Sequence, residues 1–279
     1  EVTPPVLTTN ACEGGTTLFK LKYFDRDAYL SQSAQMYLEA LIFSLDRVYS
    51  ITPSFRAEKS RTTRHLTEYW HLELEEAWVD NRGNMEIQEQ MVTAMVEAVL
   101  KNAADELSLM RKDIEPLKAI VPPFKRMTYV QAMDKLRGQG YDIGWGCDLG
   151  APEERALTAE ETVPVFVTNY PKECKAFYMK EDPEDPRTYA CADLLAPGGF
   201  GEIIGGSERE TDLDKLVARM REQDICMEPY QWYIDLRRFG SVPHSGFGLG
   251  IERVVKFICG LEHIRDAVPF PRTVSRVYP

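Results

Sequence analysis

One segment constrains the fold of this chain more than any other. Residues Tyr69–Val79 alternate between two kinds of side chain with the period of two that is typical of a β-strand. One face is apolar and the other is aromatic, acidic and polar: Trp70, Leu72 and Leu74 against Tyr69, His71, Glu73 and Glu75. Burying the polar face is unfavourable unless its side chains find hydrogen-bond or ion-pair partners. We therefore expect it either to form the floor of a ligand site or to face solvent.

Further helices and strands are expected around this strand. Apolar residues at helical spacing predict helices at 34–46, 85–109, 211–223 and 251–259, and Thr128 is expected to cap a helix that ends near Gly138 or Gly140. Other strands are expected at 48–51, 163–168, 176–179, 189–195 and 201–204. Unequal helices between long strands predict an α+β fold, with a mostly antiparallel β-sheet flanked by helices. Residues 1–279 are expected to form one domain, with 111–160 as an insertion-like segment.

Charge and hydropathy narrow the functional class. The chain carries 33 Lys and Arg against 44 Asp and Glu, a formal net charge of −11. Nucleic-acid binders usually present a basic surface, so tight RNA binding by these residues alone is not expected. No apolar run approaches the roughly 18 residues of a membrane span, and the first residues lack the basic and apolar parts of a signal peptide. We expect a cytoplasmic protein that has no membrane partner.

The segment from Phe55 to Tyr69 contains the first group of candidate functional residues. Arg56 ends an apolar strand, and its planar guanidinium suits phosphate. A basic, polar loop follows, and Tyr69 then offers a flat ring on which a purine could stack. The cations of the loop are Arg61, Arg64 and His65. The alternative is the charged tip of a β-hairpin.

Residues 246–253 form the second group. Glycines alternate at 246, 248 and 250, so one face of a strand would be bare and a flat ligand could lie against its backbone. Arg253 then falls in the first turn of a helix, where the helix dipole disfavours a cation, which indicates a role for it. The alternative is tight packing between strand and helix.

Two acids form the third group. Asp193 and Glu202 fall on strands that are expected to be adjacent and antiparallel. Carboxylates in such a pair can share a magnesium ion that also binds nucleotide phosphates. The alternative is two unrelated surface acids.

These three groups together resemble the class II aminoacyl-tRNA synthetases. Phe55–Tyr69 resembles motif 2 of that family, Gly246–Arg253 resembles motif 3, and Pro4 resembles the closing proline of motif 1. The likeness covers almost the whole chain. It implies the α+β catalytic core of the family, ATP and Mg²⁺ as cofactors, and a homodimer.

Within the class, the chain resembles the aspartate–asparagine subgroup of the archaeal and eukaryotic type. Ser31–Gln35 is similar to its substrate-amine segment, and Glu13–Gly15 is similar to its mobile lid. The resemblance implies catalytic roles for Arg56 and Arg253 and metal binding by Asp193 and Glu202. It implies ATP binding by Arg56, Glu58, Arg64, His65, Leu66, Tyr69, Glu202, Gly250 and Arg253. It implies amino-acid binding by Glu13, Ser33, Gln35, Arg56, Glu73, Ser207 and Arg209.

Two positions favour asparagine over aspartate as the amino acid. Leu38 stands where the aspartate enzymes carry a lysine, and Glu73 stands where they carry an aspartate. We expect Glu73 to accept a hydrogen bond from the carboxamide while Arg209 donates one to its oxygen. The same acid would repel a side-chain carboxylate. The segment Pro269–Arg272 also resembles the asparagine enzymes. The expected reaction is formation of asparaginyl-adenylate and transfer to tRNA(Asn).

Nothing in the chain corresponds to the N-terminal anticodon-binding β-barrel of the family. The chain is therefore expected to be either the catalytic part of a longer enzyme or a stand-alone paralogue. The acidic charge agrees with an RNA-binding part that lies elsewhere. Three alternatives stay open: an asparagine synthetase that amidates aspartate with ATP and ammonia, an aspartate-specific tRNA synthetase, and an inactive regulatory module.

Overall fold

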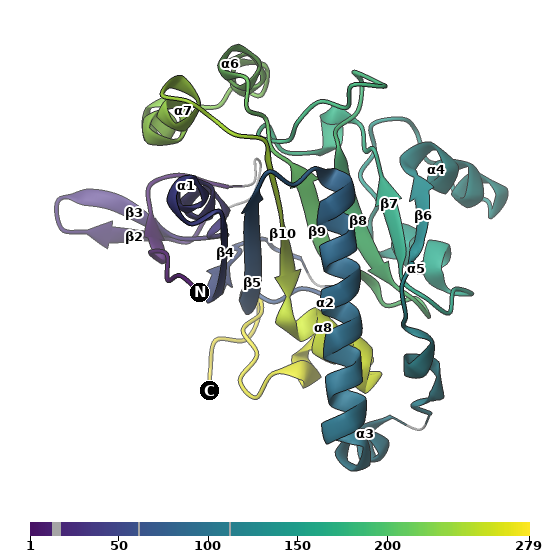
Figure 1. Ribbon diagram of the computed structural model, residues 1–279. Helices are drawn as coiled ribbons and strands as arrows, with labels where there is room; N and C mark the ends of the chain where they lie inside the picture. Colours follow the sequence, from purple (N-terminus) through teal and green to yellow (C-terminus); the bar gives the residue numbers. More distant parts are fainter. Residues whose placement is uncertain (13–17, 61, 112) are drawn as a thin grey trace.

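A central seven-stranded sheet organises the computed structural model, which describes residues 1–12, 18–60, 62–111 and 113–279. Its strand order is β4-β5-β10-β9-β8-β7-β6 (Figure 1). The strands are β4 (Arg47–Phe55), β5 (Glu68–Ala77), β6 (Lys125–Thr128), β7 (Val165–Thr168), β8 (Cys191–Ala196), β9 (Gly201–Glu208) and β10 (His244–Gly250). Every neighbouring pair is antiparallel except β6 and β7. The predicted α+β fold with a mostly antiparallel sheet is confirmed.

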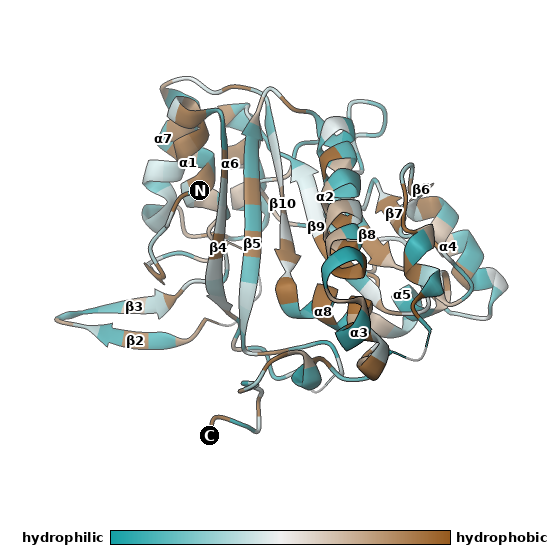
Figure 2. Ribbon diagram, turned by 60° about the horizontal axis from the view of Figure 1, so that its bottom comes forward, coloured by the Kyte–Doolittle hydropathy of each residue, from teal (hydrophilic) through white to brown (hydrophobic). Residues whose placement is uncertain are grey.

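Helices flank this sheet. They are α1 (Gln35–Leu45), α2 (Asn81–Asn102), α3 (Ala104–Met110), α4 (Tyr129–Gly138), α5 (Ala151–Thr158), α6 (Leu213–Glu222), α7 (Gln231–Arg238) and α8 (Ile251–Cys259). The main hydrophobic core lies between α2, α8 and the central strands, and its apolar segments are brown in Figure 2. Leu72 and Leu74 pack against this core. The apolar face of β5 therefore turns toward α2, and its polar face turns the other way.

Two helix ends follow directly from local sequence. The hydroxyl of Thr128 accepts a hydrogen bond from the Gln131 N–H while the Gln131 side chain accepts one from the Thr128 N–H, a capping box that starts α4. Gly260 ends α8 with a φ of 67°, a left-handed conformation that glycine adopts at little cost. Both ends were predicted.

Two predictions about elements are corrected. The helix expected at 85–109 is broken at Ala103, whose φ of −141° separates α2 from α3. The strand expected at 176–179 is wrong, because these residues form a turn in which the Met179 N–H donates to the Ala176 carbonyl. Phe177 and Tyr178 are both buried beside α6 and α7, so they do not alternate between two faces as strand residues would.

The segment 111–160 contains β6, α4 and α5, together with the 3₁₀-helix η1 (Glu115–Ala119). β6 extends the main sheet by pairing with β7, so this segment forms one edge of the core. Its status as an insertion stays a prediction.

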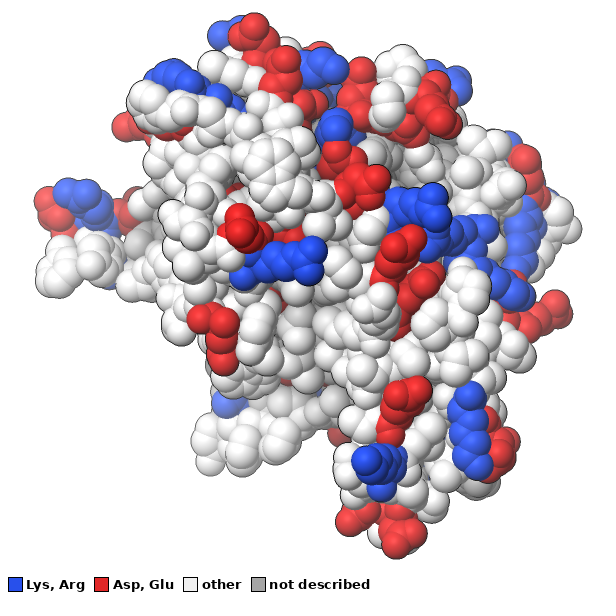
Figure 3. All heavy atoms as spheres, viewed as in Figure 1, with Lys and Arg blue, Asp and Glu red and all other residues white. Residues whose placement is uncertain are grey.

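A smaller sheet projects from the body of the protein. It contains β1 (Leu7–Thr8), β2 (Lys20–Tyr23) and β3 (Arg26–Leu30), in the order β1-β3-β2 (Figure 1). On the face drawn in Figure 3, basic and acidic side chains are interspersed. Among the described residues, none of the helices combines the length and the hydrophobicity needed to cross a bilayer.

Candidate active site

A cavity of about 960 Å³ opens on the polar face of β5. Four alternate residues of this strand, Tyr69, His71, Glu73 and Glu75, line it. The polar face is therefore the wall of a cavity, which was one of the two outcomes expected from its sequence. Most of the predicted site residues share this cavity: Ser33, Gln35, Arg56, Glu58, Arg64, His65, Leu66, Asp193, Glu202, Arg209, Gly250 and Arg253.

Three predicted residues differ in their placement. Glu13 and Arg61 lie outside the described residues. Ser207 is fully buried behind Arg209, and its Oγ accepts a hydrogen bond of 2.7 Å from Arg209 Nη1. The described lining of the cavity does not include Ser207, so it contributes by holding Arg209 rather than by facing a ligand.

One end of the cavity is strongly cationic. Arg56, Arg64 and Arg253 gather around His65 in this part of the lining. Burial and the positive charges of these guanidinium groups lower the pKa of His65 from 6.5 to about 4, so its ring is neutral at pH 7. A group of three guanidinium side chains suits an anionic ligand such as a polyphosphate.

The glycines of β10 make room for neighbouring side chains. A Cβ at Gly248 would lie 2.4 Å from His71 Nε2, and a Cβ at Gly246 would lie 2.2 Å from Glu75 Oε1. His71 and Glu75 of the adjacent strand therefore cross the bare face of β10. These side chains take up space over both glycines, although Gly248 also lines the cavity, so a flat ligand against this backbone stays a prediction. At Gly250, a Cβ would meet only Arg253, at 3.6 Å.

Asp193 and Glu202 converge from the adjacent strands β8 and β9. A Cβ at Gly205 would lie 3.3 Å from Glu202 Oε1 and 3.5 Å from Asp193 Oδ1, so both carboxylates overhang this glycine. Burial opposes ionisation of Glu202, but the charges of Arg253 and Arg64 lower its pKa to about 2. Two oxygen-donor groups that meet over a glycine at the cationic end of the cavity fit a hard cation such as Mg²⁺.

Both acids also have protein cations as partners. Arg253 Nη1 donates to Glu202 Oε2 at 2.9 Å and to the Glu202 carbonyl at 3.1 Å. Lys175 Nζ lies 2.6 Å from Asp193 Oδ2 and 3.9 Å from the centre of the Tyr170 ring. Lys175 lines the cavity and was not identified from the sequence, because it lies in a connection between β7 and β8 that matches no motif.

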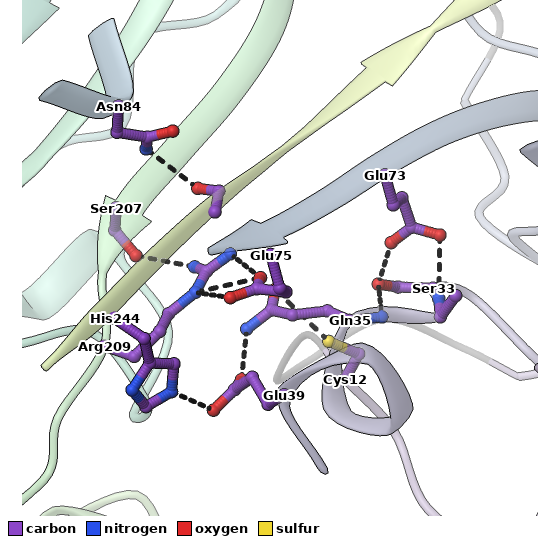
Figure 4. A network of polar contacts seen from close by, with 12 residues as sticks. Cys12, Ser33, Gln35, Glu39, Glu73, Glu75, Asn84, Ser207, Arg209 and His244 are labelled. Atoms are coloured by element: carbon purple, nitrogen blue, oxygen red, sulfur yellow. Dashed lines mark hydrogen bonds and ion pairs between the residues drawn. The ribbon is translucent and has the colours of Figure 1, made fainter. Parts of the chain in front are cut away.

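The opposite end of the cavity contains paired charges (Figure 4). Arg209 is 3% exposed, and its Nε donates to both carboxylate oxygens of Glu75 at 3.2 and 3.3 Å. Glu73 was expected opposite Arg209, but its carboxylate accepts hydrogen bonds from Ser33 Oγ and, at 2.8 Å, from the Ala34 N–H. The period of two places both acids on the same face, and Glu75 is the one that reaches Arg209.

A second buried ion pair lies behind this end. Glu39 of α1 is fully buried, and its carboxylate accepts hydrogen bonds from Arg237 Nη2 at 2.6 Å and from Gln35 Nε2 at 3.0 Å. His244 Nε2 lies 3.0 Å from the same carboxylate. Glu39 therefore ties α1 to α7 and β10. Because a carboxylate only accepts, it also directs the Gln35 carbonyl oxygen away from itself.

The two ends suit two kinds of ligand. Three guanidinium groups that gather beside two acids can bind a polyphosphate together with a divalent cation. Paired charges and fixed hydrogen-bond donors can bind a small polar molecule next to it. The cavity can thus hold two such ligands side by side.

Known proteins resemble this chain in sequence and structure. The family model described as tRNA synthetases class II (D, K and N) matches residues 1–274. The asparagine–tRNA ligase of Thermococcus kodakarensis is 61% identical over 280 residues, covering 100% of this chain and 65% of that protein. The crystal structure of asparaginyl-tRNA synthetase from Pyrococcus horikoshii complexed with asparaginyl-adenylate has a TM-score of 0.98 at 59% identity, covering 100% of this chain and 64% of that one.

A more distant structure agrees with these two. The Entamoeba histolytica asparaginyl-tRNA synthetase in complex with asparaginyl-adenylate has a TM-score of 0.91 at 38% identity, covering 100% of this chain and 62% of that one. The chain thus spans less than two thirds of the length of each of these relatives.

Proposed function

The chain belongs to the class II tRNA synthetases (D, K and N), and from that premise we propose that it is the catalytic part of an asparagine–tRNA ligase. It activates asparagine with ATP to asparaginyl-adenylate, and the full-length enzyme transfers the asparaginyl group to tRNA(Asn). One observation carries the proposal: a cavity whose cationic end adjoins a polar end in which Arg209 is already neutralised by Glu75.

The cationic end binds ATP. The guanidinium of Arg56 donates hydrogen bonds to the α-phosphate and to the substrate carboxylate. Arg64 and neutral His65 contact the γ-phosphate. Tyr69 and Arg253 hold the adenine between them. Glu58, Leu66 and Gly250 complete the ATP site. Support comes from their shared cavity and from the lowered pKa of His65, which reflects burial and the nearby charges of Arg253, Arg64 and Arg56.

Asp193 and Glu202 would hold Mg²⁺. The ion would screen the negative charge of the phosphate oxygens when it is bound. Support comes from the convergence of both carboxylates over Gly205, where a larger residue would crowd them.

The polar end binds asparagine. Ser33 and Gln35 lie near the ammonium group, as does Glu13 by resemblance to the family. Arg209 donates to the carboxamide oxygen, and Glu73 accepts from its NH₂ group. Ser207 holds Arg209 from behind. Two carboxylates face one guanidinium here, so the carboxylate side chain of aspartate would meet a surplus of negative charge. A neutral carboxamide avoids that repulsion.

The reaction needs positioning more than proton transfer. The carboxylate oxygen of asparagine attacks the α-phosphorus in line, the new O–P bond forms, and the bond to the pyrophosphate oxygen breaks. The attacking carboxylate is already ionised at pH 7, so no protein base is required. Arg56 donates to the phosphoryl oxygens as negative charge develops on them.

ATP–pyrophosphate exchange tests the proposal. Purified protein is incubated with ATP, Mg²⁺ and labelled pyrophosphate, with asparagine or with aspartate, each with and without ammonia. We expect exchange that depends on asparagine and is indifferent to ammonia. Exchange that responds only to aspartate would contradict the proposal and favour an aspartate enzyme or an amidating synthetase.

We also propose that two copies of the chain pair through β4, in the cytoplasm. β4 is an edge strand of the main sheet. Tyr49 and Ile51 on this strand are 38% and 40% exposed, and Leu45 at the end of α1 is 54% exposed. An apolar edge strand favours pairing with another chain. Light scattering at micromolar concentration tests this proposal, and a monomer would contradict it.

A further inference from the structure

Glu154 is a buried acid that no sequence motif identifies. It lies on α5, within the segment 111–160, and is 3% exposed. α5 packs beside β8 and β9, and this contact carries the Glu154 carboxylate into the lining of the cavity. An acid in this position is unexpected, because the same end of the cavity must receive the negative charge of a triphosphate.

The carboxylate of Glu154 is hydrogen-bonded to the backbone at the start of β9. Its Oε2 accepts a hydrogen bond of 2.7 Å from the Glu202 N–H. Gly201, the residue before Glu202, has a φ of +78°, and a Cβ at this position would lie 2.7 Å from Glu154 Oε2. Only a glycine leaves room for Glu154 to approach the backbone this closely. Glu154 thereby fixes the backbone that carries the Glu202 side chain.

The same oxygen also binds Arg64. Arg64 Nη1 donates to Glu154 Oε2, and its side chain is 14% exposed. Glu154 thus anchors one nitrogen of the guanidinium, and Arg64 itself lines the cavity.

We propose that Glu154 is a positioning residue for ATP, which holds Arg64 and the Glu202 backbone in the places from which they contact the triphosphate. This inference rests on the proposed function and extends its ATP site to α5. Arg64 comes from a surface loop between β4 and β5, and a long flexible side chain loses entropy when a ligand orders it. An anchor that orders Arg64 in advance removes that cost from ATP binding.

The role differs from simple structural support. Replacing a buried acid that served only stability would lower the stability of the fold and would leave the Michaelis constants unchanged. A residue that positions Arg64 affects ATP and spares asparagine, because Arg209 and Glu73 are held by other partners. Its effect must also disappear once Arg64 is gone.

The test compares Glu154→Gln with wild-type protein. Glutamine keeps an acceptor for the Glu202 N–H and removes the charge that holds Arg64. We expect the KM for ATP in asparagine-dependent exchange to rise about tenfold, with the KM for asparagine within about twofold of wild type. Titration calorimetry with ATP and Mg²⁺, without amino acid, should show the same loss of affinity. Glu153→Gln is the matched control on the same helix, and it should behave as wild type.

A double variant isolates the contact. Arg64→Gln should raise the KM for ATP, and adding Glu154→Gln to it should raise the KM no further. Additive effects, or an unchanged KM for ATP in Glu154→Gln, would overturn the inference. If Glu154→Gln melts far below wild type, Glu154→Asp replaces it, because aspartate keeps the charge but is too short to reach Arg64. An unchanged ATP affinity in that variant would overturn the inference as well.

The outcomes separate this inference from the proposed function. Wild-type protein that fails to exchange pyrophosphate with asparagine contradicts the function. Calorimetric binding of ATP still decides the role of Glu154 in that case.

Discussion

The two ends of the cavity differ in how their positively charged side chains are surrounded. At the polar end, Arg209 is paired with Glu75, and Arg237 behind it is paired with Glu39. At the cationic end, burial and the charges of Arg253, Arg64 and Arg56 lower the pKa of His65 to about 4. Arg253 and Arg64 also pair with acids there, with Glu202 and Glu154. Both ends thus contain ion pairs, but three guanidinium groups gather at one end, whereas a single guanidinium meets two carboxylates, Glu73 and Glu75, at the other.

This contrast separates two tasks within one cavity. A surplus of positive charge attracts a polyphosphate and stabilises negative charge that develops during phosphoryl chemistry. A balanced guanidinium still donates hydrogen bonds, but it exerts little net attraction on an anion, so it can bind a neutral carboxamide by geometry. Changing a residue that contacts only one substrate should therefore leave the binding of the other nearly unchanged, whereas changing Arg56, which contacts both, should affect the reaction as a whole.

The largest effect is expected from Arg56→Ala. This change removes the guanidinium that contacts both the α-phosphate and the substrate carboxylate, and no other side chain replaces it. We expect asparagine-dependent exchange to fall by about a thousandfold or more. Thermal unfolding is the control, and it should change little. Exchange near the wild-type rate would contradict the role of Arg56.

A smaller effect is expected at the polar end from Glu75→Gln. This change releases Arg209 from a buried ion pair, and we expect the KM for asparagine to rise by about 30- to 100-fold. The KM for ATP should stay within about twofold of wild type. Ser207→Ala is the matched comparison, since it removes one hydrogen bond of 2.7 Å to the same guanidinium. It should raise the KM for asparagine less than Glu75→Gln does. Equal changes in both Michaelis constants would show that the two ends are not separate.

The environment of the cationic end can be measured on His65. Its pKa of about 4 lies below the ordinary 6.5, so the folded protein binds fewer protons than the unfolded chain between these values. The contribution of His65 to stability is therefore complete above about pH 6.5 and is lost as the pH falls toward about 4. A triphosphate beside the ring should raise its pKa by one unit or more, since a nearby anion favours the charged form.

NMR titration of the His65 ring, with and without ATP, checks this expectation. His65→Gln identifies the resonance and should flatten the pH dependence of thermal unfolding between about pH 4 and 6.5. A free-protein pKa near 6.5 would contradict the buried, cationic surroundings of His65.

The smallest effects are expected from two glycines of β10. Gly248→Ala places a Cβ 2.4 Å from His71 Nε2, so the buried histidine must move, and we expect about 1–2 kcal/mol of lost stability. Gly250→Ala meets Arg253 at an ordinary 3.6 Å and should unfold at nearly the same denaturant concentration as wild type. Equal stability of the two variants would argue that His71 does not occupy the space above Gly248.

The sequence predicted one side of the site better than the other. The alternation of Tyr69–Val79 reflects the local geometry of a strand. Arg56 and Arg64 belong to one motif and Arg253 to another, and these three residues do share the cavity with the polar residues of that strand. The pairing of Arg209 with Glu75 was not predicted, because alternation identifies a face of β5 without saying which acid on it comes closest to Arg209. Glu154 and Lys175 were missed because α5 and the connection before β8 reach the cavity only through tertiary packing.

A crystal structure of the protein with a non-hydrolysable sulfamoyl analogue of asparaginyl-adenylate tests both ends at once. We predict the carboxamide within hydrogen-bonding distance of Arg209 while Glu75 still holds that guanidinium. We predict the sulfamoyl group beside Arg56 and the adenine between Tyr69 and Arg253. A carboxamide directed away from Arg209, or a nucleotide bound outside the cationic end, would contradict the division of the cavity on which this account rests.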